Sequence, residues 1–152
     1  MPTLRSFAAF VLLLIGTQLA RAEDSPLGAP ITDPAEIVHH MAGNTLRGVL
    51  KETGTPWAEF YCDTGRSLYS FGDVALGKWW TRDGKVCFAY EYNDYRFPRC
   101  FEMYGKPDGS LAFFAYDDAG QPMTFISKPP VPGDPLHLEE RAVNGCALEP
   151  SV

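Results

Sequence analysis

Arg99 is the residue whose type and position suggest the most specific chemistry in this chain. Alternation along the segment 86–103 places Arg99 on a mainly aromatic face, where its companions are Phe88, Tyr90 and Phe101. An arginine in such low-dielectric surroundings can hold a ligand carboxylate or phosphate through its paired N–H donors. The alternative is that Arg99 pairs with an internal Asp or Glu, or reaches the rim of the sheet on its long stem. We therefore take Arg99, Tyr90, Phe88 and Phe101 as candidate ligand-binding residues.

Signatures of catalysis and of metal binding are missing from the sequence. It contains no Gly-x-Ser-x-Gly, no His-Glu-x-x-His and no phosphate-binding glycine loop. Adjacent helix residues point about 100° apart, so His39 and His40 do not readily face one ion. The carboxylates that could do acid–base work are Asp63, Glu91, Asp94, Glu102, Asp117 and Asp118, and most of them fall in turns, where Asp is expected. We predict no catalytic residue, no metal and no cofactor, and keep a small hydrolase with an unrecognised site as an alternative.

The chain has four cysteines, Cys62, Cys87, Cys100 and Cys146, and no Cys-x-x-Cys. An even number without that motif indicates two disulfides, for which three connectivities are possible. The spacing within the segment 87–100 selects one of the three, because the segment begins and ends in cysteine.

A two-residue turn at Asn93-Asp94 would make Tyr92 and Tyr95 the closing pair of a β-hairpin. Counting outwards places Cys87 opposite Cys100 at a non-hydrogen-bonded site, where Cα atoms are about 4.5 Å apart, as a disulfide allows. The missing N–H of Pro98 costs this ladder nothing, because it also falls at a non-hydrogen-bonded site. We predict Cys87–Cys100 on the more hydrated face, which leaves Cys62–Cys146.

The N-terminus has the pattern of a secretory signal: Arg5, an apolar run over 7–16, and small residues at Ala20 and Ala22. The apolar run is shorter than the ~20 residues of a membrane span. We predict a cleaved signal over residues 1–22, a single mature domain over 23–152, and a periplasmic or secreted location without membrane insertion. The formal net charge of −6 makes nucleic acid an unsuitable partner.

The region from 45 to 127 predicts a mainly β fold. Short β-branched and aromatic runs are separated by turn residues roughly every ten positions. This spacing indicates an antiparallel meander of about eight strands that closes into a small barrel or a curled sheet.

A short helix is expected at each end of the meander. Asp33-Pro34 predicts a helix that ends near Gly43, and Asp134-Pro135 predicts a second one over 136–143. We expect the lead 23–32 to be irregular, and the proline-rich tail after Lys128 to stay outside the sheet.

Several stretches carry a resemblance: GNTLRG (43–48), WAEFY (57–61), GKWW (77–80) and DGKVCFAY (83–90), followed by Cys100. They are similar to a broad group of small exported bacterial proteins of uncharacterised function, in which this pattern marks a β-meander. FYCDTG (60–65) also resembles periplasmic lysozyme inhibitors, which are small disulfide-bonded β-barrels. The Ser-Gly-x-x-Tyr loop of that family does not occur here.

These features predict an exported, non-catalytic binding protein, stabilised by disulfides. Its expected partner is a small apolar or anionic molecule, or a periplasmic protein. The alternative within the same compartment is an inhibitor of a cell-wall hydrolase.

Overall fold

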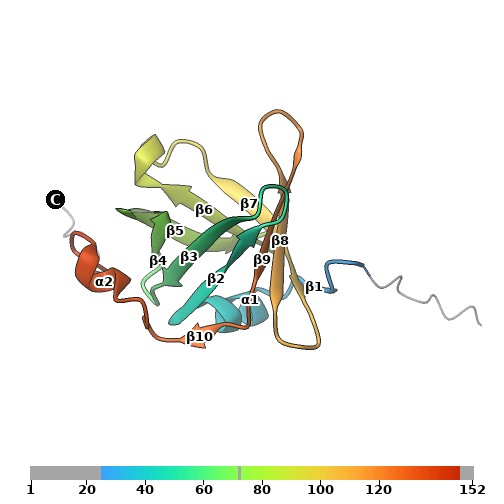
Figure 1. Ribbon diagram of the computed structural model, residues 1–152, viewed down its shortest axis with the longest axis horizontal. Helices are drawn as coiled ribbons and strands as arrows, with labels where there is room; N and C mark the ends of the chain where they lie inside the picture. Colours follow the sequence, from blue (N-terminus) through green and yellow to red (C-terminus); the bar gives the residue numbers. More distant parts are fainter. Residues whose placement is uncertain (1–24, 72, 148–152) are drawn as a thin grey trace, which may run out of the picture.

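The computed structural model describes residues 25–71 and 73–147, which form a closed antiparallel β-barrel (Figure 1). Strands β2 to β9 follow one another around the barrel in chain order, and β2 pairs with β9 to close it. Their bounds are β2 (Asn44–Leu50), β3 (Thr55–Tyr61), β4 (Arg66–Phe71), β5 (Asp73–Arg82), β6 (Lys85–Tyr90), β7 (Arg99–Gly105), β8 (Leu111–Tyr116) and β9 (Pro122–Ser127). The predicted meander and its closure into a small barrel are confirmed. The predicted signal, residues 1–22, lies outside the described residues.

The seam between the first and last barrel strands depends on a glycine. Gly48 on β2 lies opposite Ser127 on β9, and a Cβ at position 48 would overlap the carbonyl oxygen of Ile126. The absence of a side chain at Gly48 is therefore what lets the two strands approach closely enough to pair.

The link between β6 and β7 differs from the prediction. The register is the predicted one, with Cys87 opposite Cys100, but the predicted two-residue turn at Asn93-Asp94 is wrong. The chain instead enters a 3₁₀ turn, η1 (Glu91–Asn93), and both Asp94 and Tyr95 adopt left-handed backbone conformations.

The wider loop has a packing consequence. It lets the Tyr92 ring stack on that of Tyr90, with ring centroids 5.3 Å apart. A two-residue hairpin would instead have extended the ladder to a Tyr92–Tyr95 pair.

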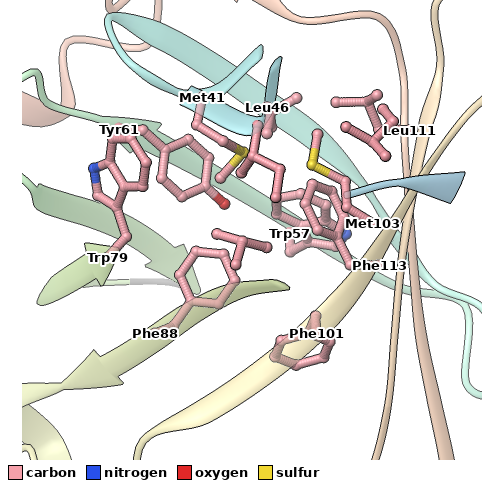
Figure 2. Close-up of a cluster of buried hydrophobic side chains, with 13 residues drawn as sticks. Met41, Leu46, Trp57, Tyr61, Trp79, Phe88, Phe101, Met103, Leu111 and Phe113 are labelled. Atoms are coloured by element: carbon pink, nitrogen blue, oxygen red, sulfur yellow. The ribbon is translucent and has the colours of Figure 1, made fainter. Parts of the chain in front are cut away.

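One end of the barrel is closed by α1 (Pro34–Met41), which begins as predicted. The Asp33 side chain accepts a hydrogen bond from the Ala35 N–H at 2.9 Å, and Pro34 occupies the first turn. Ile37 and Met41 are fully buried in the main core. Figure 2 shows Met41 pointing into the cluster of core side chains that fills this end of the barrel.

The two flanking segments contribute short strands that the sequence did not predict. β1 (Ala29–Ile31) pairs with β7, so the expectation of an irregular lead is wrong at these residues. β10 (Val131–Pro132) pairs with β2, so the expectation that the tail stays outside the sheet is also wrong. Prolines are tolerated there because a two-residue pairing at an edge does not need every N–H.

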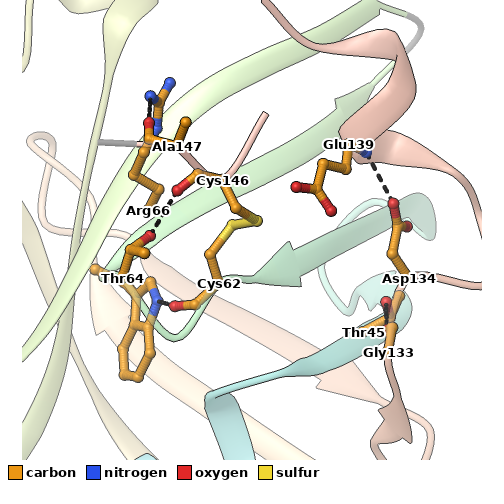
Figure 3. The surroundings of a disulfide bond; sticks show 10 residues. Thr45, Cys62, Thr64, Arg66, Gly133, Asp134, Glu139, Cys146 and Ala147 are labelled. Atoms are coloured by element: carbon orange, nitrogen blue, oxygen red, sulfur yellow. Dashed lines mark hydrogen bonds between the residues drawn. A yellow bond between two sulfur atoms is a disulfide. The ribbon is translucent and has the colours of Figure 1, made fainter. Parts of the chain in front are cut away.

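The C-terminal segment then crosses the outside of the barrel (Figure 3). Its helix, α2 (Leu138–Arg141), is shorter than the predicted 136–143. The side chain of Asp134 accepts a hydrogen bond from the Glu139 N–H at 2.8 Å. Leu138 is fully buried in a second apolar cluster, which lies outside the barrel wall and contains Phe60, Cys62 and Leu68.

Both predicted disulfides are present, Cys62–Cys146 and Cys87–Cys100. The first joins β3 to the C-terminal segment over the outer cluster. The second lies on the outer face, but the expectation of a hydrated position is wrong for Cys87, which is fully buried. Trp80 lies directly across from Cys87 on β5, and the Arg82 guanidinium is 3.3 Å from the Cys100 sulfur, so neighbouring side chains cover the bridge.

Candidate functional site

The barrel lumen contains a cavity of about 370 Å³. This volume falls in the range of sites that bind small molecules. Its mouth is at the end opposite α1, between η1 and the loop that joins β8 to β9, since Tyr92, Asn93, Asp117 and Asp118 line it there. The lumen is therefore closed by a helix at one end and accessible at the other.

The cavity walls are aromatic. The rings of Trp57 and Phe125 lie 5.6 Å apart at close to a right angle, and Phe101 contacts Phe125 in a similar way at 5.7 Å. On the other side Phe88 stacks on Tyr90 at 6.5 Å. Such edge-to-face and stacked contacts fix the walls, so that the cavity is formed before any ligand enters.

Three of the residues predicted for ligand binding, Phe88, Tyr90 and Phe101, line this cavity, and so does Arg99. Arg99 lies at the mouth, with a side chain 27% exposed. Its guanidinium donates to the backbone oxygen of Tyr116 at 2.6 Å and to the carboxylate of Asp118 at 2.7 Å. The structure thus places Arg99 in the arrangement considered as the alternative, paired with a carboxylate at the rim.

Glu59 is the carboxylate inside the cavity, and only 2% of its surface is exposed. The hydroxyl of Tyr61 donates to its Oε2 at 3.0 Å. The hydroxyl of Tyr90 lies 3.0 Å from both of its oxygens. Two phenols from different strands therefore hold one buried acid in place (Tyr61 is also drawn in Figure 2).

Burial raises the pKa of Glu59 to about 7, and the hydrogen bonds from its neighbours, Tyr61 and Tyr90 among them, only partly oppose this rise. Burial and the nearby Glu59 carboxylate also raise the pKa values of Tyr61 and Tyr90 well above the usual range. Both phenols are consequently protonated at neutral pH and act as hydrogen-bond donors to Glu59.

Glu59 was not among the residues chosen from the sequence. The carboxylates considered from the sequence are mostly turn residues, and Glu59 stands in the middle of β3. A usable signal was present: Trp57, Glu59 and Tyr61 alternate, so an acid falls on the same face as two aromatic rings. This alternation places Glu59 with Trp57 and Tyr61, but it does not by itself say which face of β3 points into the lumen.

Gly77 on β5 leaves space for the Tyr90 ring. The two residues lie opposite each other, and a Cβ at position 77 would overlap the Ser67 hydroxyl and come within 2.9 Å of the Tyr90 ring. The glycine thus allows the ring to lie flat against β5 while its hydroxyl reaches Glu59.

We expect Gly77→Ala to displace Tyr90 and lower the free energy of unfolding by about 2 kcal/mol, because the ring is held by its bond to Glu59 and cannot yield easily. Urea denaturation followed by tryptophan fluorescence measures this. Gly105→Ala is the matched control, since a Cβ there meets only the flexible end of Ile31, at 3.0 Å, and should cost less than about 1 kcal/mol. Equal losses in the two variants would contradict the role given to Gly77.

Several residue types that are common in catalytic sites do not occur in the described lining of the cavity. Its described lining includes no histidine, serine, cysteine or lysine. Among residues 25–71 and 73–147, no group of three or more His, Cys, Asp or Glu side chains is placed to hold a metal ion. In the same residues no helix is both long and apolar enough to cross a membrane.

Comparison with known proteins gave no match to a family model, a curated protein or a solved structure. The site is a pre-formed aromatic cavity with one buried acid and a mouth at which Arg99 and Asp118 form an ion pair.

Proposed function

We propose that this protein is an exported, non-catalytic binding protein that holds a small, largely apolar molecule in the barrel lumen. The observation that carries the proposal is the cavity of about 370 Å³, walled by aromatic rings and accessible from one end. A cavity of this kind removes most of a small molecule's apolar surface from water, which is the main source of affinity for such ligands.

Two further observations support binding over catalysis, and export over residence in the cytoplasm. The described cavity lining contains no histidine, serine or cysteine that could serve as a nucleophile or as its base. The two disulfides fit an oxidising compartment, in agreement with the periplasmic or secreted location that the N-terminal sequence predicts.

A neutral fluorophore tests the proposal. N-phenyl-1-naphthylamine brightens in apolar surroundings, and we expect it to bind one equivalent of the purified protein in the low micromolar range. Met123 lines the cavity, and Met123→Trp should fill the space and weaken binding by about tenfold or more. Fluorescence titration measures both.

Val49→Trp is the control, because Val49 is 41% exposed and does not line the cavity. It adds the same indole to the same barrel and should leave the affinity unchanged. Binding that is absent from the wild-type protein, or that survives Met123→Trp unaltered, would reject the lumen as the site. Native mass spectrometry of protein from its own compartment would then show whether a natural ligand co-purifies.

A further inference from the structure

The charges around the cavity are unequal. Glu59 lies within it and Asp117 and Asp118 at its mouth, whereas Arg99 is the one basic residue in the described lining. Arg99 already pairs with Asp118 and with a backbone oxygen. The positive charge that could attract an anion is thus largely neutralised, and the remaining acids would repel one.

Glu59 has no cationic partner of its own. It takes part in none of the ion pairs found among the described residues, and the groups that hydrogen-bond to it are uncharged hydroxyls. An ionised carboxylate without a counter-charge is costly in apolar surroundings, and a ligand cation would supply the missing charge.

The aromatic walls suit the same kind of ligand. Phe88, Tyr90 and Tyr92 form a stack, Tyr69 contacts Tyr90, and all four rings line the cavity together with Glu59. The faces of such rings attract a cation within about 6 Å.

We infer that the lumen selects an organic cation, an amine that carries an apolar or aromatic group, with its charged nitrogen at Glu59 and its apolar part against the ring walls. This inference rests on the proposed function, since it names the ligand class of the same cavity. It differs from the prediction of an apolar or anionic ligand held by Arg99, because the acid that faces the cavity interior is on β3.

Three probes of one shape and different charge test the inference on the wild-type protein: 4-phenylbutylamine, 4-phenylbutanol and 4-phenylbutyrate. Each is titrated at neutral pH against bound N-phenyl-1-naphthylamine. We expect the amine to bind roughly tenfold more tightly than the alcohol, and the carboxylate to bind most weakly. This comparison needs no variant, so it does not depend on a substitution folding correctly.

Glu59→Gln then assigns the preference to one residue. The amide keeps the shape but removes the charge, so the amine should lose roughly tenfold in affinity and approach the alcohol, whose own affinity should change little. Glu102→Gln is the matched control. Glu102 also accepts a hydrogen bond from the hydroxyl of a tyrosine two residues away, Tyr104, at 2.8 Å. It lies on the outside of the barrel, however, where it is paired with Lys85. All three affinities should be unchanged in this control.

The possible outcomes distinguish the inference of a cationic ligand from the proposed binding function. If the fluorophore binds but the amine is no tighter than the alcohol, the cation inference is wrong and the binding function stands. Tightest binding of 4-phenylbutyrate would also overturn the inference and return Arg99 to the role of anchor. If the fluorophore does not bind the wild-type protein, the proposed function fails and the inference fails with it.

Discussion

Replacing Cys62 and Cys146 together with alanine is expected to lower the free energy of unfolding by about 4 kcal/mol. The bridge spans a sequence separation of 84 residues, so its loss restores much conformational freedom to the unfolded chain. It also releases the C-terminal segment that buries Phe60 and Leu68 on the outer wall. Alanine is preferred to serine because Cys62 is only 2% exposed and a buried hydroxyl would add a separate cost.

The Cys87–Cys100 pair serves as the comparison. Its separation is 13 residues, so the corresponding double alanine variant should lose less, about 3 kcal/mol. Guanidinium denaturation followed by tryptophan fluorescence gives both values. A larger loss for the shorter loop would show that covering the outer cluster contributes little, and that loop entropy is not the deciding term.

Stability is expected to fall as pH rises through neutrality, by roughly 2 to 3 kcal/mol between about pH 5 and about pH 8. The cause is Glu59, whose pKa burial raises from 4.5 to about 7. A folded state with the higher pKa binds the proton more tightly than the unfolded chain does. Its contribution is therefore complete below the unfolded pKa and is lost as pH rises through the folded one.

The groups that face Glu59 do not titrate in the same window. Burial raises the pKa values of the surrounding phenols, Tyr61, Tyr69, Tyr90 and Tyr92, above their ordinary value of 10. The charged residues at the mouth of the cavity are Arg99, Asp117 and Asp118.

The decisive measurement is the difference between the wild-type protein and Glu59→Gln in urea denaturation at several pH values. The variant cannot ionise at this position, so its stability should be flatter with pH and should match or exceed that of the wild type at about pH 8. Glu102→Gln, on the outer face, should keep the wild-type slope. Parallel curves for wild type and Glu59→Gln would show that Glu59 is not the group responsible.

Most of the barrel could be predicted because its signals are local. Each strand is a short apolar run between turn residues, and the Cys87–Cys100 spacing supplies a register that the structure retains. The turn was harder, because left-handed backbone at both Asp94 and Tyr95 is uncommon and nothing in the tyrosine indicates it. Short strands such as β1 and β10 form only because a partner strand lies beside them. Their few residues show no alternation from which a strand could be predicted.

The residues of the candidate site also differ in whether local sequence signals could identify them. The face shared by Phe88, Tyr90 and Phe101 follows from alternation, and these side chains do line the cavity. The pairing of Arg99 with Asp118 joins β7 to a loop after β8, and only the three-dimensional closure of the barrel brings them together. Glu59 depended on knowing that β3 presents its odd-numbered residues to the lumen, which the register of β6 and β7 alone does not establish.

The pairing of β2 with β9 also constrains how the chain reaches its native state. The contact joins the first and last barrel strands, so closure must wait until nearly the whole meander has emerged and ordered, and folding should be slow for a chain of this size. Until then the aromatic inner face is open to solvent and to other chains, a state prone to aggregation. The Cys87–Cys100 bridge can form in an isolated hairpin. Cys146 follows β9 in the chain, so the second pair can oxidise only after all the barrel strands have been synthesised.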